Sequence, residues 1–169
     1  MELCEDCRYP LSRESHHDHD GLCCDCFDQS SGMPENKRRI PRPIVKPASL
    51  VIRDRKLLVV RTIGRTHYYA LGGKLEKGET ELQCLDREAR EEVGCGVVNP
   101  QYYGTFAGPN TDNTKFVVMI GYLTQLDQEP QPCSEIESLL WANTRTTEPL
   151  GSLIRDQIMP ALVKDGLID

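Results

Sequence analysis

Gly72-Gly-Lys-Leu-Glu-Lys-Gly-Glu-Thr-Glu-Leu-Gln-Cys-Leu-Asp-Arg-Glu-Ala-Arg-Glu-Glu-Val-Gly94 is the stretch that decides the fold of this 169-residue chain. Two glycines come first, then a run with helical periodicity from Glu79 to Val93, and a further glycine ends the run. Thr80 is the expected N-cap, because its hydroxyl suits the open backbone amides of a first turn. A rotation of about 100° per residue gives the run one apolar stripe, formed by Leu82, Leu85, Ala89 and Val93. The stretch therefore predicts an amphipathic helix that packs on a core.

The same rotation places three carboxylates on one arc of about 100°, those of Glu88, Glu91 and Glu92. Like charges three and four residues apart repel, so this arc is costly unless a cation lies among the acids. Clustered oxygen ligands of this kind suit Mg²⁺ or Mn²⁺. Arg87 could orient Glu91, and Gly73 could offer its carbonyl to the metal. The alternative interpretation is a solvated helix face.

The stretch resembles the signature of the Nudix hydrolases, Gly-x5-Glu-x7-Arg-Glu-U-x-Glu-Glu-x-Gly-U, in which U is a bulky apolar residue. All fixed positions of the signature are present: Gly73, Glu79, Arg87, Glu88, Glu91, Glu92 and Gly94. Only two apolar positions depart from it, since Ala89 and Cys95 are small. The resemblance implies the α/β class, with a Nudix-type α/β/α sandwich around a mixed sheet over residues 46–169.

The resemblance also implies the activity, hydrolysis of a nucleoside diphosphate linked to another moiety. Such a hydrolase acts on diphosphate (acid anhydride) bonds and cleaves P–O–P with a metal-activated water. Glu79 and Arg87 would support the site by pairing and orientation. The ligands of Mg²⁺ (or Mn²⁺), carried over by position, are the Gly73 carbonyl, Glu88, Glu91 and Glu92.

The general base stays open, because family members use either a glutamate of the signature or one from a later loop. Glu88 or Glu92 comes first and Glu137 next, among the acids that precede Trp141: Glu129, Glu135 and Glu137. The alternative function is a catalytically weak Nudix-fold nucleotide sensor that uses the N-terminal segment to dock a partner. The intact carboxylate trio speaks against that alternative, because a pure binder has no need of three clustered acids.

The first 30 residues predict a small zinc ribbon. Cys4, Cys7, Cys23 and Cys26 form two Cys-x2-Cys pairs, a spacing that suits tetrahedral Zn²⁺. A reduced Cys-rich tail is the alternative, and three histidines in the intervening loop could replace a ligand: His16, His17 and His19. Some Nudix hydrolases, including NADH pyrophosphatases, carry a zinc ribbon before the catalytic domain.

Charge distribution bears on the partners. Residues 1–30 carry eight acidic side chains against two arginines, which accounts for the whole net charge of −6. Such a head repels phosphates, so nucleic acid is not expected as a partner, although a zinc module acting on nucleic acid is a third hypothesis. Residues 31–45, rich in proline and basic residues, predict a linker between head and body. The expected partner is a small nucleotide-diphosphate substrate, and a homodimer is left open.

The remaining pattern predicts a cytoplasmic protein and outlines the body. No apolar run approaches the roughly 20 residues of a membrane helix, and the acidic N-terminus lacks a secretory signal. Strands are expected at 49–53, 56–61, 67–71, 97–106, 116–126 and 136–141, with a C-terminal helix over 150–163 that Pro160 kinks or bounds. Two segments could line a substrate pocket: residues 67–69, which otherwise would be an ordinary strand, and 110–113, otherwise a turn.

Overall fold

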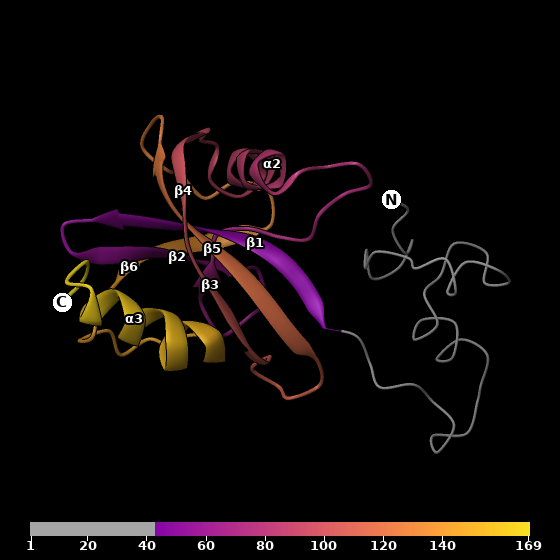
Figure 1. The fold of residues 1–169 in the computed structure, drawn as a ribbon. Coiled ribbons are helices and arrows are strands. Elements are labelled where there is room, and N and C mark those ends of the chain that lie inside the picture. The colour runs from indigo at the N-terminus through magenta and orange to yellow at the C-terminus, as the bar shows by residue number, and fades with distance from the viewer. Residues whose placement is uncertain (1–42) are drawn as a thin grey trace, which may run out of the picture.

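The structure, a computed structural model, describes residues 43–169 (Figure 1). The predicted zinc ribbon, with Cys4, Cys7, Cys23 and Cys26, lies outside these residues, so Zn²⁺ binding stays a prediction. The elements follow one another as β1 (Ile44–Arg53), β2 (Lys56–Thr62), β3 (Tyr69–Ala70), α2 (Glu81–Val93), β4 (Val97–Pro109), β5 (Phe116–Leu126), β6 (Ile136–Ala142), a π-helical turn (Ile154–Ile158) and α3 (Met159–Lys164).

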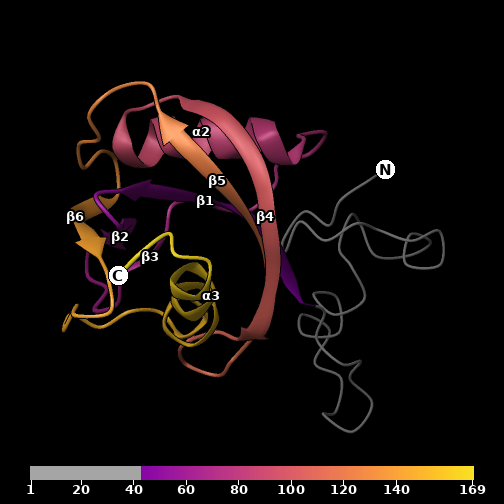
Figure 2. The ribbon, with the colours of Figure 1, turned by 60° about the vertical axis from the view of Figure 1, so that its left-hand side comes forward.

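The strands form one mixed sheet in the order β3-β2-β1-β5-β4, with β6 added beside β2. Strands β1 and β5 run parallel, and the other pairs are antiparallel. Helix α2 covers one face and α3 the opposite face, as Figures 1 and 2 show. Ala89 and Val93 of α2 pack on one core cluster, and Ile158 and Leu162 at the C-terminus pack on the other. The predicted α/β/α sandwich around a mixed sheet is confirmed.

Strand β1 begins at Ile44, five residues before the predicted start, because it accommodates Pro47. Ser49 donates its backbone N–H to the Leu71 carbonyl at 2.8 Å, on the edge of β1 that faces away from β5. Residues two apart face the same edge, so the N–H that Pro47 lacks would point toward the glycine pair and not toward β5. A Cβ on Gly72 would lie 2.6 Å from the Pro47 carbonyl oxygen, which explains the need for glycine there.

Helix α2 starts and ends where its capping residues require. The Thr80 side chain accepts a hydrogen bond from the Gln83 backbone N–H, and the Gln83 side chain accepts one from the Thr80 N–H. This capping box confirms Thr80 as the N-cap and places the first helical residue at Glu81, two residues later than predicted. Gly94 ends the helix with a φ of 70°, in the left-handed region that favours glycine.

The predicted C-terminal helix is divided by a π-helical turn. Met159 donates its backbone N–H to the carbonyl of Ile154, five residues earlier, immediately before Pro160. Proline has no N–H with which to continue the hydrogen bonds of an α-helix. The kink or boundary predicted at Pro160 is therefore present as a wider, π-helical turn just before it. Within residues 43–169, neither α-helix has both the length and the apolar character that crossing a membrane requires.

Candidate active site

Arg87 on α2 binds together an acidic cluster, defined as Glu79, Glu88 and Glu91 with Arg87 at its centre. Its guanidinium donates to Glu79 at 2.8 and 3.1 Å, to Glu88 Oε1 at 2.8 Å and to Glu91 Oε2 at 3.1 Å. A further bond at 3.0 Å reaches the Lys74 carbonyl and ties the helix to the segment that follows the glycine pair. Arg87 and Glu79 are paired in the structure, and their role in supporting the site stays a prediction.

Burial differs among the carboxylates of the cluster. The side chains of Glu79 and Glu88 are 11% and 16% exposed, whereas that of Glu91 is 57% exposed. Bonding to Arg87 lowers the pKa of Glu79. In Glu88, burial raises the pKa against the opposing effect of Arg87. Glu88 therefore carries a charge that its surroundings stabilise poorly.

Gly73 and Glu88 occupy adjoining space. A Cβ on Gly73 would overlap the Glu88 carboxylate, so the absence of a side chain is what lets this carboxylate lie against the backbone. The carbonyl of Gly73 belongs to the same short segment. The predicted metal ligands combine this backbone carbonyl with glutamate side chains, so the backbone has to lie close to a carboxylate.

Glu92 is held separately from the cluster. Its Oε2 accepts a hydrogen bond from the Gly72 N–H at 3.0 Å. Burial raises the pKa of Glu92 to about 7, the Gly72 N–H lowers it, and the nearby charge of Glu88 raises it further. A carboxyl with a raised pKa beside a second carboxylate is suited to accept a proton. A bound cation would stabilise the charged form of Glu92.

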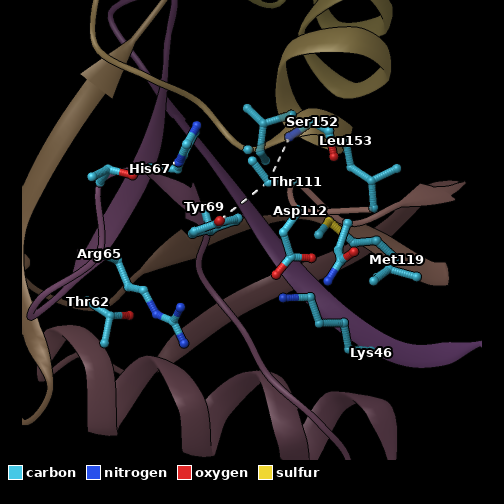
Figure 3. Close-up of a pocket in the computed structure, with 15 residues that line it drawn as sticks. Lys46, Thr62, Arg65, His67, Tyr69, Thr111, Asp112, Met119, Ser152 and Leu153 are labelled. Atoms are coloured by element: carbon cyan, nitrogen blue, oxygen red, sulfur yellow. Dashed lines mark hydrogen bonds between the residues drawn. The ribbon is translucent and has the colours of Figure 1, made fainter. Parts of the chain in front are cut away.

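Lys46 on β1 is a functional candidate from the basic stretch, which the sequence offered as a phosphate-facing patch but favoured as a solvated linker. Burial lowers the pKa of its amine, and the charges of Glu92 and Glu88 raise it, so the amine lies within the field of both carboxylates. Figure 3 shows Lys46 extending into a cavity that lies beside α2. Its position in the sequence, at the boundary of a Pro-rich basic stretch, did not indicate that it lies near these two carboxylates.

The predicted trio does not converge on one point in this structure. Glu88 and Glu91 bond to Arg87, whereas Glu92 bonds to Gly72. Among residues 43–169, no group of three or more His, Cys, Asp or Glu side chains stands ready around one metal position. The residues nevertheless fit a divalent cation chemically, because buried carboxylates with raised pKa values lie against a side-chain-free backbone.

The later acids differ in what surrounds them. Glu137, the predicted second choice for the base, lies 3.2 Å from Arg61 Nε, although the geometry is not that of a hydrogen bond. Glu129 pairs with Arg53 at 2.6 Å. Glu135 lies near Glu92 and contributes to its raised pKa, in a loop that the Cys133 N–H fastens to the Glu92 carbonyl at 3.0 Å. Of these three, Glu135 is therefore the one that the structure brings to Glu92.

A cavity of about 500 Å³ is lined by Lys46, whose amine lies in the field of Glu88 and Glu92 (Figure 3). Both segments that the sequence offered as pocket linings contribute: His67 and Tyr69 from the first, and Asn110, Thr111 and Asp112 from the second. Tyr68, by contrast, is buried in the core. The other lining residues come from β1, β2, β5 and the start of the C-terminal helix: Lys46, Thr62, Arg65, Thr66, Val117, Met119, Gly151, Ser152, Leu153 and Ile154.

Comparison with known proteins identifies the family. The family model described as NUDIX domain matches residues 44–161. The chain belongs to the Nudix family. This confirms the family that the signature indicated and, at the level of the family, the predicted class of enzyme, a hydrolase of diphosphate bonds.

Similar curated proteins include NAD-capped RNA hydrolases NudC. The protein from Stutzerimonas stutzeri is 34% identical over 115 residues, which are 65% of this chain and 38% of the relative. The protein from Pseudomonas putida strain W619 is 33% identical over 122 residues, 69% of this chain and 42% of the relative. The chain thus matches only about two fifths of the length of these relatives.

Solved structures share the Nudix fold. A nudix hydrolase family member from Chromobacterium violaceum has a TM-score of 0.61 at 26% identity, over 75% of this chain and 82% of that one. The MutT protein from Methanosarcina mazei has a TM-score of 0.62 at 21% identity, over 75% and 99% of the two chains. At this identity the second likeness shows the fold alone.

Proposed function

We propose that residues 46–169 form a catalytic domain that hydrolyses a nucleoside diphosphate linked to another moiety. The observation that carries this proposal is the placement of Glu88 and Glu92. Both are partly buried carboxylates with raised pKa values, and both lie against the glycine pair. Both also raise the pKa of the Lys46 amine, and Lys46 lines the cavity. The cavity volume of about 500 Å³ is within the range of small-molecule sites.

The residues proposed to hold Mg²⁺ or Mn²⁺ are Glu88, Glu91, Glu92 and the Gly73 carbonyl. When bound, the metal would neutralise charge on the diphosphate and make water more acidic. Arg87 keeps Glu88 and Glu91 in place, and Lys46 attracts the anionic diphosphate toward the carboxylates.

Glu92 is the proposed general base, ahead of Glu88. Its carboxylate is held against the glycine pair by the Gly72 N–H, and burial raises its pKa, which favours the uptake of a proton from the attacking water. Glu137 remains a candidate from the sequence, but the neighbourhood of Glu92 contains Glu135 instead.

The relatives widen the choice of substrates. Their names describe hydrolases of NAD-capped RNA, so a dinucleotide at the end of an RNA joins the small nucleotides as a candidate. The expectation that nucleic acid is not a partner therefore has no support from the relatives. The zinc ribbon of residues 1–30 is proposed as an accessory segment, and the cytoplasm as the location.

A substrate panel with Mg²⁺ tests the proposal. We expect phosphate-containing product from at least one of ADP-ribose, NADH, dinucleoside polyphosphates, oxidised dNTPs and an NAD-capped oligonucleotide. Glu92→Gln should lose at least about 10²-fold in turnover, because it removes a ligand and the proton acceptor. Glu148→Gln, in an exposed loop, is the matched control and should keep wild-type turnover. Equal turnover of Glu92→Gln and wild type would refute the assignment.

A further inference from the structure

The cavity changes in chemical character along its walls. Lys46 and Arg65 line it, and within residues 43–169 neither forms an ion pair. Tyr69 contributes an aromatic ring whose hydroxyl donates to Thr111 Oγ1 at 3.4 Å. Apolar side chains complete the lining: Val117, Met119, Leu153 and Ile154. A ligand with an anionic end and a flat, less polar end matches these walls.

Asp112 is the only acidic side chain among the described residues that line this cavity. Its Oδ1 accepts hydrogen bonds from the Thr114 hydroxyl at 2.6 Å and the Thr114 N–H at 3.2 Å. These bonds lower the pKa of Asp112, so the carboxylate is charged at neutral pH. Both of these bonds end on Oδ1.

The position of Asp112 restricts what can lie beside it. Figure 3 shows its carboxylate between Lys46 and the Tyr69–Thr111 pair. A phosphate would be repelled here and attracted by Lys46, whereas a hydroxyl group can donate to the carboxylate in a charge-assisted hydrogen bond. A single carboxylate is also a poor cation site, since Mg²⁺ and Ca²⁺ need several oxygen ligands. The ligand group opposite Asp112 is therefore neutral and carries O–H donors.

We propose that Asp112 binds the sugar hydroxyls of the substrate and so makes the enzyme select a ribonucleoside diphosphate. This inference rests on the proposed function and adds the orientation of the substrate. In a nucleotide the sugar lies between the phosphates and the base, as Asp112 lies between Lys46 and Tyr69. The phosphates then face α2, and the base faces Tyr69 and the apolar wall.

Equilibrium binding of analogues that cannot be hydrolysed tests this selection. The full chain is titrated by calorimetry with α,β-methylene-ADP and with its 2′,3′-dideoxy form. We expect the wild type to bind the dideoxy form about tenfold more weakly, as for loss of a hydrogen bond to a charged group. In Asp112→Ala the two affinities should agree within about twofold. Asp112→Asn, which keeps an oxygen for Thr114, should show an intermediate ratio.

Asp156→Ala is the matched control, because Asp156 is an exposed acid that pairs with Arg155 and does not line the cavity. It should keep the tenfold ratio. Three results would each overturn the proposal: a wild-type ratio near one, an unchanged ratio in Asp112→Ala, or no binding of any analogue. A fourth would be a loss of affinity for α,β-methylene-IDP, which lacks the base amine, because Asp112 would then bind the base and not the sugar. The titrations measure binding and the substrate panel measures hydrolysis. Either experiment can therefore fail while the other succeeds, so the two proposals are tested separately.

Discussion

In the acidic cluster on α2, Arg87 bonds three carboxylates and a backbone carbonyl, whereas in the neighbouring cavity Lys46 and Arg65 form no ion pair within residues 43–169. The single guanidinium holds the geometry of the cluster before any ligand arrives, although three carboxylates against one cation leave an excess of negative charge. The cavity leaves its cations available to a ligand. Chemistry and recognition are thus built differently, the first by internal bonds and the second by groups without partners.

Glu92 belongs to neither region. It is partly buried like Glu79 and Glu88, yet it accepts a hydrogen bond from the Gly72 backbone and forms no ion pair with any residue of 43–169. The comparison therefore makes a distinction that can be tested. Substitutions in the cluster should displace the carboxylates that are proposed to hold the metal. A substitution at Glu92 should remove its charge and leave the position of the other carboxylates nearly unchanged.

Among the changes that leave every charge in place, the largest expected effect comes from Gly73→Ala. The added Cβ would overlap the Glu88 carboxylate and displace it from the backbone, although the side chain can rotate away without unfolding the protein. We expect turnover to fall 10- to 100-fold, as when the support of a metal ligand is removed, with a small change in melting temperature. Turnover and thermal unfolding are measured on the same samples.

Gly104→Ala is the matched control for that substitution, since a Cβ there would meet Phe106 at 3.5 Å, an ordinary contact. It should retain turnover within about twofold, as expected for a change that adds no overlap. If Gly73→Ala also retained turnover, the close approach of Glu88 to the backbone would have no catalytic importance.

Arg87→Lys should have the next largest effect. Lysine keeps the positive charge but cannot reach Glu79, Glu88, Glu91 and the Lys74 carbonyl at once, because it lacks the planar fork of donors. We expect turnover to fall about tenfold, with KM changed less than kcat, since orientation and not net charge is lost. Steady-state kinetics on the best substrate of the panel provide the measurement.

Arg90→Lys serves as the comparison, because Arg90 lies on the same helix, is exposed, and bonds only to Asp86. Its turnover should stay close to that of the wild type, as for other surface ion pairs. A tenfold loss in both variants would mean that arginine stabilises the helix in general and that Arg87 has no special part.

The acidic cluster was predictable from the sequence because it lies on one helix and the loop before it. Residue spacing along a helix fixes which side chains share a face, so arithmetic placed Glu88, Glu91 and Glu92 on one arc and Arg87 one turn before Glu91. The direction of Glu92 could not be predicted in this way, since it depends on the Gly72 N–H, which in turn depends on Pro47 of β1.

The cavity could be anticipated only in fragments. Its walls come from segments as distant in the sequence as Lys46 and Ser152, which the sheet topology brings together. Periodicity describes one element at a time and carries no information on such contacts. The early start of β1 was missed for a related reason, because Pro47 resembles linker residues until the edge that its missing N–H faces is known.

The smallest effect concerns stability and its dependence on pH. Burial raises the pKa of Glu92 to about 7, above the ordinary value of 4.5 that applies in the unfolded chain. Between these values the folded state binds more protons than the unfolded state, so the free energy of unfolding falls as pH rises from about 5 to about 7. Gln cannot ionise. In the absence of metal, Glu92→Gln should therefore be more stable than the wild type by roughly 1 to 3 kcal/mol at pH 7.5, the upper figure being the full pKa shift, and the difference should shrink toward pH 5.

Urea unfolding with a chelator, at several pH values between 5 and 8, measures this difference. Saturating Mg²⁺ should narrow it at pH 7.5, because a cation bound by the carboxylate stabilises the wild type and not the variant. Glu148→Gln should show no such pH dependence, since that side chain is exposed. If the free energies of unfolding of Glu92→Gln and the wild type differed by the same amount at every pH, the burial of a charge at Glu92 would not explain the difference. Glu92 would then not be distinguished in this way from the acids bonded to Arg87.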